Sequence, residues 1–230
     1  MKDLTQGSIP RHLLAMAAPM VIGMLVQTLY YLVDLYYVSK LGDAAVAGVG
    51  TAATYALAVM ALTQVFSVGT VALIARAVGA KDRENANLIF NQSLVLAGLC
   101  SGIALIGGYL LLGPYMHALG SDAATKAAGE EYLRWFIPGL ALQFAMVALV
   151  SALRGTGIVG PTMTVQMVTV LVNVVLAPVL IAGVGTGHAM GVAGAGLAST
   201  IAVVVGTGLL TYYYLKLEKY VERSEEHTSE

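Results

Sequence analysis

Charged residues are scarce in this sequence. Only 11% of its 230 residues are Asp, Glu, Lys or Arg, whereas 58% are hydrophobic. A mean hydropathy of +0.79 excludes an intrinsically disordered chain and does not fit a water-facing surface. The net charge of −1 offers nothing to a polyanion, so a nucleic-acid-binding module is excluded as well. The composition therefore predicts an integral membrane protein.

Catalytic and metal-binding residues are scarce too. The single Cys100 cannot form an intrachain disulfide, and its apolar surroundings favour a packing role. The sequence contains no HExxH, no GxSxG and no Walker loop. Its histidines are scattered over different loops and ends: His12, His117, His188 and His227. We expect no enzyme, no resident cofactor and no histidine metal site.

Long apolar runs occupy most of the chain. A helix needs roughly 20 apolar residues to cross a hydrocarbon core about 30 Å thick. Between Gly155 and Leu215 there is no charged residue, and the glycine-rich segment from Gly183 to Gly191 divides this stretch into two helices. The pattern predicts an all-α integral membrane protein with six transmembrane helices, at about residues 13–38, 46–75, 88–112, 130–153, 160–182 and 191–215.

The basic residues predict the orientation of these six spans. Nine of them fall on one side: Lys2, Arg11, Arg76, Lys81, Arg83, Arg154, Lys216, Lys219 and Arg223. Three fall on the other side: Lys40, Lys126 and Arg134. Basic loops stay in the cytoplasm, so we expect residues 1–12 and the tail 216–230 to be cytoplasmic. From Arg223 the tail reads RSEEHTSE, which resembles a translated library adapter and is left out of the fold prediction.

Asp34 is the one ionisable residue well inside a predicted span. A carboxylate at the centre of a membrane helix costs about 2.5 to 3.5 kcal/mol, so such a residue is by default a functional candidate. Gln27, Tyr30, Tyr31 and Tyr37 share a helix face with Asp34 through i, i+3, i+4, i+7 spacing. We interpret this stripe as facing a cavity. The alternative is an Asp34 near the membrane surface that is merely solvated.

A second polar stripe lies on the fifth span. Thr162, Gln166, Thr169 and Asn173 share one helix face. Their hydroxyl and amide oxygens, joined to a carboxylate, are ligands that a cation accepts. The alternative is hydrogen bonding between helices, for which membrane helices often use Thr, Gln and Asn. For the aligned set we favour a cavity wall.

Four stretches of the chain together resemble one transporter family. They are PMVIGMLVQTLYYLVDLYYVSKLG, ARAVGAKDRENA, SALRGTGIVGPTM, and NVVLAPVLIAG followed by MGVAGAGLAS. In this order they resemble the N-terminal half of a multidrug and toxic compound extrusion (MATE) transporter, over about Leu4 to Leu215. The resemblance implies twelve spans in two six-helix lobes, of which this chain supplies the N-lobe and lacks the C-terminal lobe.

The resemblance also implies a function and a site. It implies an antiporter in a bacterial inner membrane that is driven by H⁺ or Na⁺ and exports organic cations. Asp34 matches the family's cation-coupling acid, and Asn173 matches a nearby amide, so a Na⁺ ion would bind at these two residues. Many members carry an acid four residues after this Asn, where the present chain has Ala177. Asp34 is then the only carboxylate of the lobe interior.

Two other functions stay open. Flippases for lipid-linked sugars share this architecture, but their cavities are expected to carry basic groups for phosphates. No Lys or Arg lies well inside a span here, which favours organic cations as cargo. The Tyr30, Tyr31, Tyr36 and Tyr37 side chains would add cation–π contacts to such a cargo. A non-transporting membrane scaffold is the third reading, and it would make Asp34 dispensable.

Overall fold

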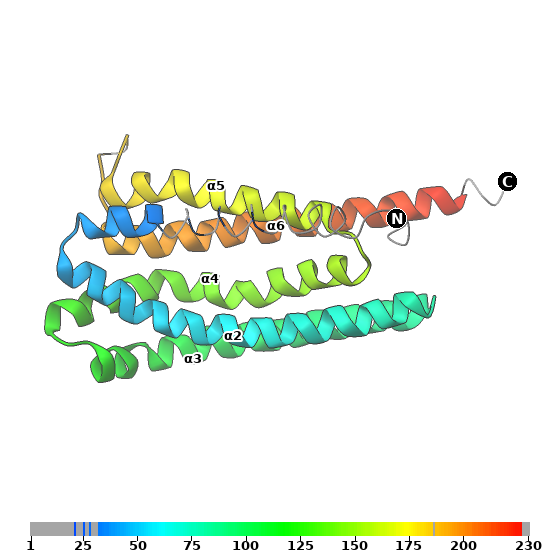
Figure 1. The fold of residues 1–230 in the computed structure, drawn as a ribbon, viewed down its shortest axis with the longest axis horizontal. Coiled ribbons are helices and arrows are strands. Elements are labelled where there is room, and N and C mark those ends of the chain that lie inside the picture. The colour runs from blue at the N-terminus through cyan, green and yellow to red at the C-terminus, as the bar shows by residue number, and fades with distance from the viewer. Residues whose placement is uncertain (1–20, 22–24, 26–27, 29–31, 186, 227–230) are drawn as a thin grey trace.

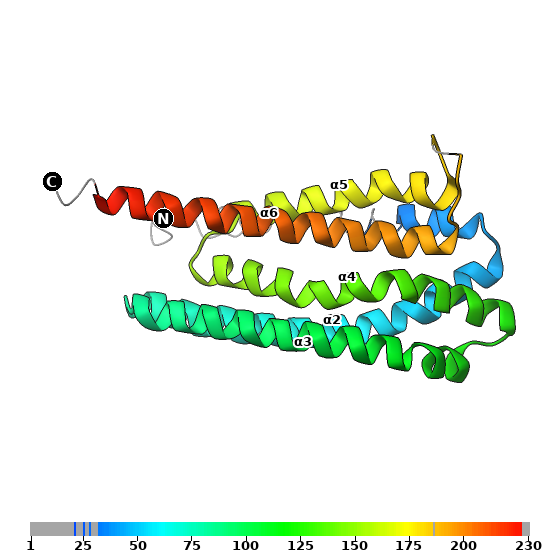
Figure 2. The same cartoon turned by 180° about the vertical axis from the view of Figure 1, so that it is seen from behind.

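The protein is an elongated bundle of helices that run alternately up and down (Figures 1 and 2). The structure, a computed structural model, describes residues 21, 25, 28, 32–185 and 187–226. Within them residues 21, 25, 28 and 32–39 of a first helix are followed by α2 (Asp43–Gly79), α3 (Arg83–Leu119), α4 (Ala123–Gly155), α5 (Gly160–Ala182) and α6 (Val192–Glu226). The described residues contain no strand. The predicted all-α class is confirmed.

Five of these helices are long and apolar enough to cross a membrane. The helix α5 has the predicted bounds 160–182, whereas α2 and α3 extend beyond the predicted spans at both ends and reach 37 residues each. At 1.5 Å per residue they are about 55 Å long, well over the hydrocarbon thickness. The predicted first span 13–38 is described continuously only from residue 32, and α6 continues as a helix through 216–226.

Local caps decide where the helices begin. The Asp82 side chain accepts a hydrogen bond from the Asn85 amide at 3.0 Å and starts α3. Asp122 accepts one from the Thr125 amide at 2.9 Å and starts α4 in the same way. The α5 helix ends at Gly183, whose φ of 67° is the left-handed conformation that glycine adopts without strain. The caps at Asp82 and Asp122 therefore start α3 and α4 in polar segments, outside the apolar runs.

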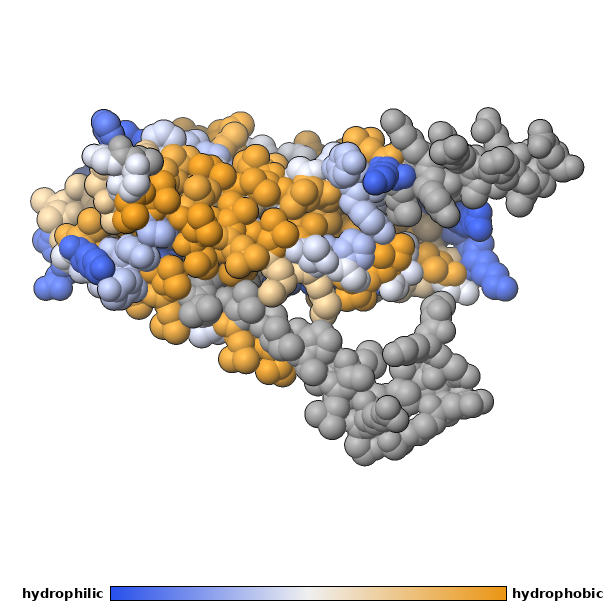
Figure 3. All heavy atoms as spheres, turned by 90° about the horizontal axis from the view of Figure 1, so that it is seen from above, coloured by the Kyte–Doolittle hydropathy of each residue, from blue (hydrophilic) through white to orange (hydrophobic). Residues whose placement is uncertain are grey.

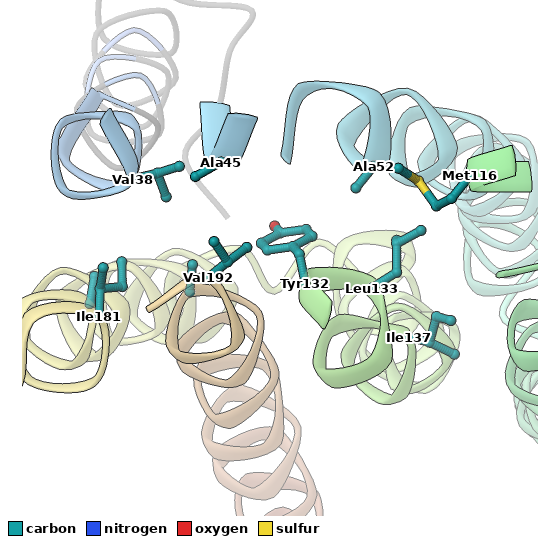
Figure 4. Packing of buried hydrophobic residues seen from close by; sticks show 11 residues of the cluster. Val38, Ala45, Ala52, Met116, Tyr132, Leu133, Ile137, Ile181 and Val192 are labelled. Carbon is teal, nitrogen blue, oxygen red and sulfur yellow. The ribbon is translucent and has the colours of Figure 1, made fainter. Parts of the chain in front are cut away.

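The helix α4 lies at the centre of the bundle and packs against α2, α3 and α6. Glycine permits the closest approaches. A methyl group added at Gly48 of α2 would lie 2.7 Å from the Gly129 amide nitrogen of α4, and one added at Gly196 of α6 would clash with the Tyr132 carbonyl oxygen. Around Tyr132 a buried apolar cluster joins residues from all six helices (Figure 4). This cluster fixes the first helix against the rest of the bundle.

The two ends of the bundle differ in charge. The acidic end carries the loops at 40–42, 120–122 and 183–191, and the basic end carries the loops at 80–82 and 156–159. Counted only up to residue 216, the basic end has Arg76, Lys81, Arg83, Arg154 and Lys216 against two acids, Asp82 and Glu84. A broad apolar surface separates the polar ends in Figure 3. This banding is the surface that a bilayer requires.

Candidate cation site

Asp34 lies in the first helix and is the one charged residue among the buried polar residues of the described chain. Its side chain is 9% exposed, and its Oδ1 atom has no hydrogen-bond partner among the described residues. Buried polar atoms in proteins are nearly always paired, so an unpaired carboxylate oxygen needs an explanation. The structure therefore places the Asp34 carboxylate inside the lobe, as predicted, and its function stays a prediction.

Asn173 presents a second oxygen of this kind. Its side chain is 2% exposed, and its Nδ2 donates a hydrogen bond to Ser199 Oγ of α6 at 3.2 Å. This bond fixes the orientation of the amide and leaves Oδ1 buried without a partner. In the described part of the chain, Asp34 Oδ1 and Asn173 Oδ1 are the two buried side-chain atoms left unpaired.

The first helix and α5 place Asp34 near the level of Ala177, about one helical turn from Asn173. Both helices run towards the acidic end (Figure 1), and a methyl group added at Gly191, at the end of the loop 183–191 that follows α5, would lie 3.8 Å from Leu41 Cδ1. Val38, Ala177 and Ile181 belong to one buried cluster, in which Figure 4 shows Val38 and Ile181. Asp34 lies one turn before Val38, and Ala177 lies one turn before Ile181. Ala177 is therefore level with Asp34.

The chemistry of these two oxygens suits a small cation. A carboxylate and an amide carbonyl are hard oxygen ligands, and Na⁺ or a proton would satisfy the acceptor capacity that the protein leaves open. No group of three or more His, Cys, Asp or Glu side chains that could hold a metal occurs among the described residues. Any bound Na⁺ would therefore depend on neutral oxygens beside the single carboxylate.

The rest of the α5 stripe faces α6. Thr162 Oγ1 and Thr169 Oγ1 donate to the carbonyls of Val159 and Val165 on their own helix, at 2.7 and 2.8 Å. A methyl group added at Gly206 of α6 would lie 2.5 Å from Thr169 Oγ1. Gln166, on the same face, is half-buried. At Thr169 and Asn173 the polar face of α5 is thus a helix–helix contact.

The aromatic residues of the first helix lie further towards the acidic end. Tyr37 is half-buried against the central cluster, whereas the Tyr36 side chain is 56% exposed. The Lys40 ammonium lies over both rings. The other predicted members of this stripe, Gln27, Tyr30 and Tyr31, lie outside the described residues.

Two residues that contribute to the region were absent from the predicted set. Ser199 holds the Asn173 amide, and Lys40 covers the tyrosines. The sequence does indicate Ser199. In two helices joined by a short loop, residues at similar distances from that loop lie opposite each other. Asn173 and Ser199 lie ten residues before and eight residues after the loop 183–191. No comparable pattern indicates Lys40.

Comparison with known families identifies the chain. The family model MatE matches residues 19–179. The chain belongs to the MatE family. Among the curated relatives of this MatE chain, the FAD transporter of Shewanella oneidensis is 23% identical and covers 97% of the chain. The probable multidrug resistance protein NorM of Thermotoga maritima is 28% identical over 92% of it.

Solved MATE structures share the fold. One, described as an outward-facing conformation of a multidrug resistance MATE family transporter of the MOP superfamily, matches with a TM-score of 0.79 and 31% identity. The match covers 85% of the present chain and 43% of the solved chain. A MOP superfamily transporter from Pyrococcus furiosus matches with a TM-score of 0.74 and 30% identity, over 86% of this chain and 43% of its own.

The chain covers a similar share of each of these relatives. The MatE chain covers 50% of the Shewanella relative and 46% of the Thermotoga relative. It therefore spans about half the length of the curated relatives that it matches. This agrees with the prediction that the chain corresponds to one lobe of a two-lobe transporter.

Proposed function

We propose that this lobe is half of a cation-coupled antiporter that exports organic cations, and that Asp34 is the carboxylate at which the coupling ion and the cargo alternate. The observation that carries the proposal is the pair of unpaired buried oxygens, Asp34 Oδ1 and Asn173 Oδ1. An unsatisfied acceptor in a packed bundle is costly, so a bound cation is the simplest reason to keep two of them.

The coupling follows from charge. One carboxylate carries one negative charge, so it compensates either a coupling ion or a cationic cargo, and simultaneous binding leaves an excess positive charge in a poorly solvated site. Asn173 Oδ1 would serve Na⁺ as a neutral ligand, whereas a proton needs Asp34 alone. Exchange of the two cations becomes antiport when two lobes rock around the site.

The charge of the lobe interior supports organic cations as the cargo class. Its described buried side chains include one carboxylate and no Lys or Arg. A relative at 23% identity is named an FAD transporter, and FAD carries phosphate groups. The alternative flippase function requires recognition of phosphate groups as well. Phosphates are bound by Arg, Lys or helix N-termini. The buried side chains of this lobe offer a cation the better match.

The matched variants Asp34→Asn and Asp43→Asn test the proposal. Both lose one carboxylate, but Asp43 is exposed in the first turn of α2. In a two-lobe transporter that contains this lobe, Asp34→Asn should reduce ion-driven efflux of ethidium at least tenfold, and Asp43→Asn should leave it within twofold. Expression and folding of both should equal those of the parent. Normal ion-driven efflux by Asp34→Asn across the pH range would refute the proposal and favour the scaffold alternative.

We also propose that the basic end faces the cytoplasm of a bacterial cell whose inner membrane the lobe spans. The excess of basic residues at that end supports this orientation. After replacement of Cys100, a cysteine at Ser121 should react with an impermeant thiol reagent from outside intact cells. A cysteine at Asp82 should react only after permeabilisation. The reverse pattern would contradict the orientation without affecting the role of Asp34.

A further inference from the structure

The aromatic pair at the end of the first helix already holds a cation, and that cation belongs to the chain. The Lys40 Nζ atom lies 4.2 Å from the centroid of the Tyr36 ring and 5.4 Å from that of the Tyr37 ring. The two rings meet edge to face, with 5.3 Å between their centroids. A cation within about 6 Å of a ring centroid is attracted by the negative face of the ring. Two rings therefore share one ammonium.

This aromatic pair connects the surface to the candidate cation site. Tyr36 lies on the outside of the lobe, with 56% of its side chain exposed. Tyr37 is half-buried and follows Asp34 by three residues, a spacing that makes two side chains neighbours on a helix surface. The rings thus lie between Asp34 and the acidic end of the bundle.

Lys40 is held at this place by its contacts with the two tyrosines and not by an ion pair within the described residues. It lies in the turn that ends the first helix, and the next glycine, Gly42, has a φ of 108°. The described residues offer it no carboxylate within ion-pair distance. A side-chain hydrogen bond with Tyr36 raises the pKa of Lys40, so the ammonium stays charged. A cation–π contact at an exposed site favours the bound position by only about two- to fivefold. A second cation can therefore displace it.

We propose that Tyr36 and Tyr37 form a binding site for organic cations at the acidic end, and that Lys40 is its tethered competitor. The proposal rests on the function proposed above, because the ligand class is that of the cargo. An arriving organic cation replaces the Lys40 ammonium on the rings, and Lys40 returns when that cation leaves. Because Lys40 occupies the rings part of the time, it lowers the apparent affinity and favours release at this end.

The experiment measures ethidium binding to the full chain by fluorescence anisotropy, in phosphatidylcholine nanodiscs with empty nanodiscs as the blank. Lys40→Met should lower the dissociation constant about three- to sixfold, because the rings become free. Lys40→Arg keeps a cation that stacks on the rings and should stay within twofold of the unmodified chain. Lys126→Met removes a lysine from the same end and should also stay within twofold.

Tyr36→Leu separates the aromatic site from a general charge effect. In the Tyr36→Leu background the gain from Lys40→Met should disappear, because the cation has lost its main ring. Circular dichroism checks that each variant is folded. An unchanged dissociation constant for Lys40→Met would overturn the proposal. So would a gain that persists without the Tyr36 ring, since it would report only the loss of a distant charge.

Asp34→Asn distinguishes this proposal from the function on which it rests. The ratio between the dissociation constants of the parent and of Lys40→Met should be the same with and without the Asp34 carboxylate. Loss of that ratio in Asp34→Asn would place ethidium at Asp34 and overturn the aromatic site. If this ratio is unchanged in Asp34→Asn and the variant also shows normal ion-driven efflux, only the proposed coupling role of Asp34 is overturned.

Discussion

The two sides of the bundle treat buried polar groups in opposite ways. Between α2, α3 and α4 the hydroxyls pair with each other: Ser67 Oγ lies 2.8 Å from Ser151 Oγ, and Thr70 Oγ1 lies 3.4 Å from Ser93 Oγ. Between the first helix, α5 and α6, two oxygens have no partner. Both sides are buried, so solvent does not explain the difference.

The two sides thus separate polar groups that hold helices together from polar groups that have no partner within the described part of the lobe. Paired hydroxyls stabilise contact between membrane helices by about 0.6 kcal/mol each. Unpaired buried acceptors cost free energy and persist where function requires them. On this basis we call the α2–α3–α4 side the paired side and the first helix–α5–α6 side the unpaired side. Substitutions on each should have effects of opposite sign.

The largest effect should come from filling the closest helix contact of the paired side. A Cβ at Gly48 would lie 2.7 Å from the Gly129 nitrogen and 2.7 Å from the Thr125 carbonyl oxygen, both of them backbone atoms. Gly48→Ala must push α2 away from α4 and should lower the free energy of unfolding by about 3 kcal/mol. Gly50→Ala, two residues on with open space around it, is the control and should be neutral or more stable by up to about 1 kcal/mol, because alanine favours the helix. Equal stabilities in denaturant titration would contradict the packing.

Removing the unpaired carboxylate should stabilise the lobe. Asp34→Leu replaces a buried acceptor that lacks a partner by an apolar side chain, and we expect a gain of about 2 kcal/mol in unfolding free energy together with loss of cation binding. Thermal unfolding followed by Trp135 fluorescence measures the first effect. A destabilised Asp34→Leu chain would mean that the carboxylate is paired in the protein, which would erase the difference between the two sides.

Removing a polar side chain from the paired side should instead lower the free energy of unfolding. Ser151→Ala leaves the Ser67 hydroxyl buried without its partner and should cost about 1 kcal/mol. The double variant Ser67→Ala with Ser151→Ala should cost less than the sum of the single variants, because it leaves no orphan. Strict additivity would show that the two hydroxyls do not form a coupled pair.

The smallest effect concerns the α4 cap on the paired side. Hydrogen bonds from the Thr125 amide and hydroxyl, and from the Ser121 hydroxyl, hold the pKa of Asp122 below its usual value. A carboxyl group with a lowered folded pKa stabilises the fold above its unfolded pKa, about 3.9, and this contribution disappears as the pH falls through the folded value. Asp122→Ala should therefore be less stable than the parent at pH 7, and the gap should narrow in acid.

The sequence predicts some of this structure because membrane spans are set by composition. The span at 160–182 and the burial of Asp34 follow from apolar runs and from the cost of a charge in lipid. The ends of α3 and α4 do not, because the caps at Asp82 and Asp122 lie outside those runs. A polar stripe predicts which residues share a helix face, but it does not predict which helix packs against that face. Thr169 satisfies its hydroxyl within its own helix and packs on α6.

The central place of α4 has a consequence for how the lobe is made. The spans leave the ribosome in order, so α2, α3 and α4 can pack together while α5 and α6 are still being synthesised. The α6 side of α4 is covered only by a helix that arrives last, and Leu210 of α6 and Leu153 of α4 belong to one buried cluster. Nascent chains halted before α6 should therefore display an open α4 surface to insertion chaperones, and completion of α6 should end that association.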